Sequence, residues 1–284
     1  MKYRQSVTRA RRTLFLLLID CSESMSETIR CGSEERTKAD AACEMGNTML
    51  SELVERARRS DGIHDYYDVG VIGYSGRGIG SLLGDEWWLP VDRLAAMERR
   101  TVTRTVERTM PDGRRGLHRV QYPCWFTPTT GGRTPMYEMF ALVDDLLKGW
   151  CGDPRHAESF PPVLFHLTDG EASDCDEESL IDICRRIRSH RTADGEVLLL
   201  NNHLASNATL PAFLFPASAG ELGENRYARL LYDCSSTMPA CFEPAIRDLK
   251  GTAEPGPFRG MSYNCSIHEL TSLLNIGSVS IPLH

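Results

Sequence analysis

The sequence lacks an apolar run long enough to cross a membrane. A transmembrane helix needs about 20 consecutive apolar residues, whereas the run at 14–19 ends after a few residues. Basic residues precede this run, as they do in a secretion signal. However, Asp20 and Glu23 follow it, where a signal peptide would have small residues for cleavage. We therefore predict a cytoplasmic protein without a signal peptide or membrane anchor.

A second absence concerns cysteine motifs. The sequence holds ten cysteines, but none of them forms a Cys-x-x-Cys pair, the spacing typical of zinc ribbons and thioredoxin-like redox sites. Several lie within or beside predicted helices and strands, among them Cys21, Cys43 and Cys184. Because no secretion signal accompanies them, we expect reduced, partly buried thiols rather than a disulfide framework.

Common catalytic motifs are absent as well. The sequence has no Gly-x-Ser-x-Gly turn, no glycine-rich phosphate loop ending in Lys-Ser or Lys-Thr, and no His-Glu-x-x-His helix. Gly76, Gly78 and Gly80 alternate with other residues, but they do not stand between a strand and a helix, as a dinucleotide site requires. The familiar serine hydrolase, P-loop and zinc peptidase classes therefore have no support in the sequence.

The composition is that of an ordinary globular protein. The chain has 284 residues, a formal net charge of −7 and a pI near 5.7. This length suits one sizeable α/β domain or two small ones. The modest negative charge gives no reason to expect nucleic acid or an anionic membrane as the main partner. No low-complexity linker and no internal repeat divides the chain.

One stretch near the N-terminus organises the rest of the chain. Residues 14–19 are all apolar, and Asp20, Ser22 and Ser24 follow directly. A continuous apolar run of this length predicts a strand that is buried on both faces, as parallel strands usually are. In open α/β sheets, ligand sites gather beyond the carboxyl ends of such strands. One carboxylate and two hydroxyls offer hard oxygen donors, which suit Mg²⁺ or Mn²⁺.

Two later segments complete a known pattern. The loop Gly-Gly-Arg-Thr-Pro supplies Thr134 just before a predicted helix, and Asp169 follows a second apolar run. Together with Asp20, Ser22 and Ser24, these residues resemble the metal-ion-dependent adhesion site of the von Willebrand factor A (vWA) domain. The alternative is an α/β domain whose turns contain Asp, Ser and Thr only because these are common turn residues.

The resemblance implies a function and a set of partners. In vWA domains the hydroxyls bind Mg²⁺ (Mn²⁺ is possible), at least one Asp acts through water, and a Glu or Asp of a protein partner completes the coordination. The C-terminal third also resembles bacterial stand-alone vWA proteins of the TerY-like group. These are linked with PP2C-type phosphatases, protein kinases or AAA+ ATPases in stress, signalling or defence systems. The resemblance therefore implies a non-enzymatic adaptor.

The periodicity of the chain predicts alternating strands and helices. Strands are expected at 14–19, 66–74, 163–168 and 197–200, with edge pieces at 81–83 and 88–91, and helices at 37–59, 135–150 and 176–190. An irregular stretch is expected at 26–35. In the C-terminal third we expect strands at 212–215 and 258–264 and helices at 224–233, 244–250 and 267–275. This alternation predicts a doubly wound α/β fold, with a mostly parallel central sheet and helices on both faces.

The whole chain, 1–284, is predicted to be a single vWA domain with a core at about 12–276. An insertion at about 93–125 has weak periodicity and many arginines. One interpretation is a patch for an acidic partner or nucleic acid. The other is a solvated insertion, which an isolated basic stretch in an acidic protein favours.

The rival enzymatic interpretation is a metal-dependent hydrolase. Such chemistry needs a general base besides the metal, and the candidates near the motif are His166 and Glu171. His166 stands inside a predicted strand, which favours a core histidine.

Further acidic residues follow the second apolar run. Glu171, Asp174 and Asp176 either tune the field at the metal or stabilise a helix N-terminus, and the helix-terminus role is favoured. Asp174 with Glu177 resembles a capping box for the helix at 176–190.

Overall fold

The computed structural model describes residues 2–31, 34–109, 115–206 and 211–265. The strands of the central sheet are β1 (Thr13–Asp20), β6 (Tyr67–Ser75), β7 (Gly78–Ser81), β8 (Leu89–Pro90), β11 (Val163–Thr168), β12 (Leu198–His203), β13 (Phe213–Leu214) and β14 (Met261–Tyr263). Three two-stranded ribbons are formed by β2 (Thr28–Cys31) with β3 (Glu34–Thr37), β4 (Arg58–Arg59) with β5 (Gly62–Ile63), and β9 (Arg100–Thr109) with β10 (Arg115–Cys124).

The α-helices are α1 (Lys38–Ala57), α2 (Val91–Ala96), α3 (Met136–Gly152), α4 (Glu177–Ser189), α5 (Arg226–Cys234) and α6 (Glu243–Lys250). Single 3₁₀ turns occur at η1 (Glu23–Ser26), η2 (Pro154–His156), η3 (Ala219–Leu222) and η4 (Ala240–Phe242).

The central sheet has the order β13-β14-β12-β11-β1-β6-β7, and β8 pairs with β6. Strands β6, β1, β11, β12 and β14 run parallel, while β7, β8 and β13 are antiparallel additions at the two edges. The chain therefore has the predicted α/β fold with a mostly parallel central sheet.

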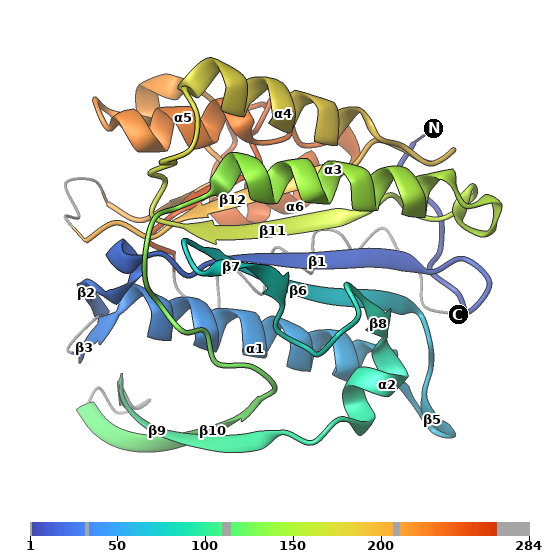
Figure 1. Ribbon diagram of the computed structural model, residues 1–284, viewed down its shortest axis with the longest axis horizontal. Helices are drawn as coiled ribbons and strands as arrows, with labels where there is room; N and C mark the ends of the chain where they lie inside the picture. Colours follow the sequence, from blue (N-terminus) through green and yellow to red (C-terminus); the bar gives the residue numbers. More distant parts are fainter. Residues whose placement is uncertain (1, 32–33, 110–114, 207–210, 266–284) are drawn as a thin grey trace.

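Helices cover both faces of this sheet (Figure 1). Every residue of β1 is buried, and alternate residues face opposite layers because side chains alternate along a strand. Leu16 and Leu18 pack with α3, α4 and part of α5. Leu17 and Ile19 pack with α1, α2 and α6. The continuous apolar run in the sequence thus reflects a strand with a hydrophobic layer on each side.

The predicted helix at 37–59 agrees closely with α1. The Thr37 hydroxyl accepts a hydrogen bond from the Asp40 N–H at 3.0 Å and caps the helix. The capping prediction for Asp174 is wrong. Its carboxylate accepts from the N–H groups of Tyr137 (3.2 Å) and Glu138 (2.9 Å), so it satisfies the first turn of α3. Helix α4 is capped by Asp176, which accepts from Ser179 N at 2.7 Å.

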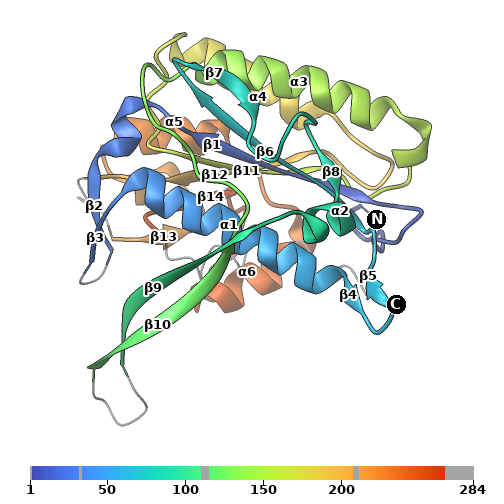
Figure 2. The ribbon, with the colours of Figure 1, turned by 60° about the horizontal axis from the view of Figure 1, so that its bottom comes forward.

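Two segments are more regular than predicted. Residues 26–35 were expected to be irregular, but most of them belong to the β2–β3 hairpin. Within 93–125, β9 and β10 form a long antiparallel ribbon that projects from the body beside α1 (Figure 2). Thr101 and Thr103 are exposed and Val102 is only half-buried. The ribbon lies outside the central sheet, so its sequence need not carry the continuous apolar run of a strand buried on both faces.

The C-terminal third places β14 between β12 and β13. Strand β12 extends beyond the predicted 197–200 to Asn201, Asn202 and His203, which are all buried. Asn201 is accommodated because its amide hydrogen-bonds His166 and Ser235. The helix predicted at 267–275 lies outside the described residues. The division into one domain with an insertion stays a prediction.

The described part of the chain contains no helix that is both long and apolar enough to cross a membrane. None of the nine cysteines with described side chains forms a disulfide. Burial raises the pKa of the Cys21, Cys43 and Cys151 thiols to about 12.

Candidate metal centre

Asp20 ends β1 at the carboxyl edge of the sheet. Its side chain is fully buried, and both oxygens are held. Oδ1 accepts from the Ser22 N–H at 2.9 Å and Oδ2 from the Thr168 hydroxyl at 2.7 Å. Burial raises the pKa of Asp20 to about 6, partly offset by hydrogen bonds from Ser22 and Thr168. An ionised carboxylate in this position would be stabilised by a nearby cation.

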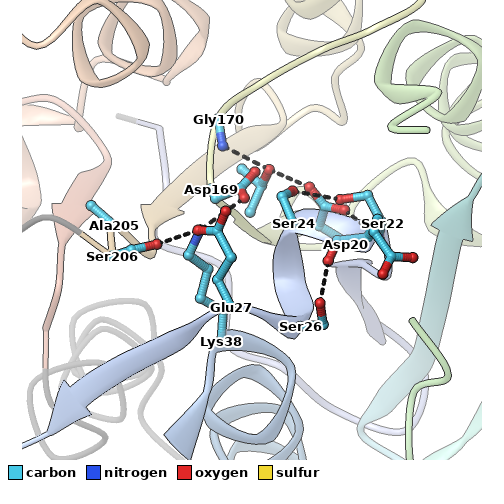
Figure 3. Close-up of polar contacts among 12 residues, drawn as sticks. Asp20, Ser22, Ser24, Ser26, Glu27, Lys38, Asp169, Gly170, Ala205 and Ser206 are labelled. Atoms are coloured by element: carbon cyan, nitrogen blue, oxygen red, sulfur yellow. Dashed lines mark hydrogen bonds and ion pairs between the residues drawn. The ribbon is translucent and has the colours of Figure 1, made fainter. Parts of the chain in front are cut away.

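Ser22 and Ser24 place two hydroxyls next to this carboxylate (Figure 3). Their Oγ atoms lie 3.1 Å apart. Ser22 stands at the N-cap of η1, but its hydroxyl makes no capping hydrogen bond. The turn is anchored by the fully buried Met25. The hydroxyls are therefore presented together by a short turn whose position the core fixes.

The loop that carries Thr134 is tied to the same turn by two backbone hydrogen bonds of 2.9 Å. Gly131 N–H donates to the Cys21 carbonyl, and Glu23 N–H donates to the Gly132 carbonyl. Gly132 has φ +77°, and a Cβ there would lie 3.0 Å from the Gly76 Cα. Glycine is required because the backbones approach closely and the conformation is left-handed.

Thr134 itself is buried, and Ser173 holds its backbone. The Ser173 hydroxyl accepts from Thr134 N at 2.8 Å and donates to Thr134 O at 3.0 Å. The Ser173 N–H also donates to Thr134 O at 3.0 Å. The segment after β11 thus supports the threonine loop, a role for Ser173 that no sequence pattern indicated.

Asp169 follows β11, the parallel neighbour of β1. Besides burial, its negative charge raises the pKa of Asp20, because the two carboxylates repel each other. Asp169 Oδ2 accepts from Lys38 Nζ at 3.0 Å. Its Oδ1 is buried and has no hydrogen-bond partner. Because an unpaired buried acceptor is costly, this oxygen marks a place where a cation would stabilise the structure.

Lys38 and Glu27 are site residues that the sequence did not identify. The Lys38 ammonium lies between Glu27 Oε2 (2.8 Å) and Asp169 Oδ2 (3.0 Å), and Ser206 Oγ donates to Glu27 from the far side (Figure 3). These hydrogen bonds, first among them that from Lys38, lower the pKa of Glu27. In the sequence, Lys38 is unusual only as a basic residue in the first turn of a predicted helix, where the helix dipole favours acidic residues.

The donor set suits a hard divalent ion. Two carboxylates and neighbouring hydroxyls supply oxygen alone, the chemistry that Mg²⁺ prefers. Among the described residues, no group of three or more His, Cys, Asp and Glu side chains could hold a metal, so a site for zinc or copper has no support there. The unpaired Asp169 oxygen and the two neighbouring serine hydroxyls are donors that suit Mg²⁺ or Mn²⁺. The contact of the Lys38 ammonium with Asp169 opposes the binding of a cation.

His166 is part of the core. It is fully buried in β11, where Nε2 lies 2.7 Å from the Tyr74 hydroxyl and Nδ1 lies 2.8 Å from Asn201 Oδ1. Burial lowers the pKa of His166 to about 4. Glu171 is exposed and hydrogen-bonds Tyr227. His166 is therefore not placed as a general base that faces the candidate site.

The solved structures that resemble this chain include two vWA proteins of low sequence identity. The SpRpn10 VWA domain has a TM-score of 0.38 and 12% identity, over 69% of this chain and 77% of that domain. A von Willebrand factor type A protein from Catenulispora acidiphila has a TM-score of 0.40 and 14% identity, over 79% of this chain. This chain spans 43% of the Catenulispora protein's length. Because both TM-scores are low, the α/β fold is assigned from the order and direction of the strands in the sheet.

No protein-family model and no curated protein matches the sequence.

Proposed function

We propose that this protein is a non-enzymatic, divalent-cation-dependent module for protein–protein interaction, built as a single vWA domain. The proposed ligands of Mg²⁺, or of Mn²⁺ in its place, are Asp20, Ser22, Ser24, Thr134 and Asp169. The observation that carries the proposal is the buried Asp169 Oδ1 without a partner, at the end of the strand that is the parallel neighbour of β1, which leads into the two serine hydroxyls. A bound cation would satisfy all three groups at once.

The charge of these residues favours an acidic partner. Asp20 and Asp169 together carry two negative charges, which only just neutralise a divalent ion. A Glu or Asp from a partner protein would therefore be drawn to a coordination position that the chain's own donors leave open. A charge-assisted contact of this kind is stronger than a neutral one and makes recognition dependent on the ion.

The burial of His166 argues against its use as the general base of a hydrolase. Metal-assisted hydrolysis needs a group that takes a proton from water, and His166 is enclosed by Tyr74 and Asn201. The second alternative, nucleic-acid binding by the arginine-rich insertion, has no specific support among the residues of the insertion whose side chains are described. Arg93 pairs with Glu86, and Arg99 and Arg100 contact Ala95 and Thr127.

The class of partner follows from the sequence resemblance alone. This resemblance to bacterial stand-alone vWA proteins implies a cytoplasmic adaptor in a stress, signalling or defence system. Its partner would be a PP2C-type phosphatase, a protein kinase or an AAA+ ATPase.

The proposal is tested by capturing partners from a lysate of the source organism. The full chain should retain an acidic partner in Mg²⁺, release it in EDTA and recover it when Mg²⁺ is restored. Thr134→Ala should weaken capture several-fold, because it removes an uncharged ligand that water replaces. Thr129→Ala is the matched control, since Thr129 is exposed in the same loop. Capture that is undiminished in EDTA would contradict metal-bridged recognition.

A further inference from the structure

Lys38 occupies a position that local preferences oppose. It is the first residue of α1, where the positive end of the helix dipole disfavours a cation. Its side chain is only 4% exposed, and lysine is rarely buried unless it is paired. Residues that break such rules are concentrated at functional sites. The placement therefore indicates a functional role for the contact between the Lys38 ammonium and Asp169.

The two partners of this ammonium differ in exposure. The Asp169 side chain is 8% exposed and the Glu27 side chain is 57% exposed. Glu27 is also fixed by a backbone hydrogen bond of 3.0 Å from Lys38 N–H to its carbonyl and by Ser206. The ammonium thus bridges an inner carboxylate at the candidate metal centre and an outer carboxylate at its rim.

We propose that Lys38 is a tethered cation that competes with the divalent ion for Asp169, and that Glu27 holds the ammonium when the ion binds. This inference rests on the proposed metal site and adds its regulation. Asp20, Asp169 and Glu27 with Lys38 carry a net formal charge of minus two, which a divalent ion cancels. Without Lys38 the loaded site would stay negative and would repel a partner carboxylate.

Lys38 should therefore set the affinity for the ion. A unit charge and a divalent ion about 6 Å apart repel each other enough to weaken binding about tenfold, even at the dielectric constant of water. Removing the ammonium should tighten ion binding by about this factor or more. Removing the Glu27 charge should have the opposite effect, because the ammonium would then remain on Asp169.

The test is a titration of the metal-free full chain with Mn²⁺, in which paramagnetic resonance measures the free ion. We expect Lys38→Met to bind Mn²⁺ about tenfold more tightly than the wild type, and Glu27→Gln to bind it several-fold more weakly. Lys148→Met is the matched control, because Lys148 is exposed near the far end of α3. It should bind like the wild type.

The outcomes separate the two proposals. Equal Mn²⁺ affinity in the wild type and Lys38→Met would overturn the role of Lys38 and leave the metal site standing. If Lys38→Met binds Mn²⁺ and the wild type does not, the inference is supported, because the ammonium then keeps the ion from the site. No binding by either would overturn the metal site and the inference with it. If Lys38→Met does not fold, Glu27→Gln decides, because its exposed side chain is not required by the core. Unchanged affinity in Glu27→Gln would then overturn the inference.

Discussion

Asp20→Asn should lower the affinity for Mg²⁺ about 100-fold or more while leaving the fold intact. The amide keeps the shape of the side chain and an oxygen that accepts from Ser22 N–H, but it removes one of two anionic ligands. Isothermal titration calorimetry of the metal-free chain measures the loss. Asp145→Asn is the matched control, since Asp145 is an exposed carboxylate on α3.

The stability of this variant gives a second readout. Because burial raises the pKa of Asp20 to about 6 from 3.8, its ionised form is less stable in the folded protein than in the unfolded chain. This cost grows as pH rises from about 4 to 6 and is fully present above pH 6. Asp20→Asn in EDTA at pH 8 should therefore be at least as stable as the wild type. Unchanged Mg²⁺ affinity in a folded Asp20→Asn variant would exclude Asp20 as a ligand.

Asp169→Asn should have the opposite effect on stability. Its carboxylate is the buried partner of Lys38, and removing one member of a buried ion pair leaves the other charge uncompensated. Glu27 remains as a second, exposed partner, so we expect a loss of about 1–3 kcal/mol in the free energy of unfolding rather than the full cost of an unpaired charge. Urea denaturation in EDTA measures this loss.

A double-mutant cycle isolates the interaction. Lys38→Met alone should also destabilise the metal-free protein, because Asp169 loses its cation. The double variant Lys38→Met, Asp169→Asn should recover much of the stability, since neither charge is then left buried alone. Effects that simply add would show that the two side chains do not stabilise each other.

The sequence predicted the strands that the core buries on both sides. β1 and β11 are predominantly apolar because hydrophobic layers cover both faces of the sheet. The β9–β10 ribbon could not be predicted in this way, because its two strands pair with each other outside the central sheet. The polar end of β12 was missed for a different reason. Asn201 is tolerated inside the sheet only because partners from β11 and the end of α5 meet its amide.

The candidate site likewise contains residues that the sequence predicted and one, Lys38, that it did not. Asp20, Ser22 and Ser24 form a local motif, and the backbone links between Gly131 and Cys21 bring the threonine loop to the same turn. Lys38 is separated from Asp169 by 131 positions in the chain. Its contact exists only because the β2–β3 hairpin sets the start of α1 beside the end of β11. No pattern within a single segment can predict such a contact.

The most direct test of the metal centre is a crystal structure of the full chain grown with Mn²⁺ and recorded at wavelengths on both sides of the manganese absorption edge. We expect an anomalous peak beside the hydroxyls of Ser22 and Ser24 and close to Asp169 Oδ1, at distances near the ~2.1 Å typical of a small divalent ion and oxygen. In that structure Lys38 should contact Glu27 and no longer Asp169. If no peak appears at saturating Mn²⁺ and Lys38 still contacts Asp169, the proposed metal centre is wrong.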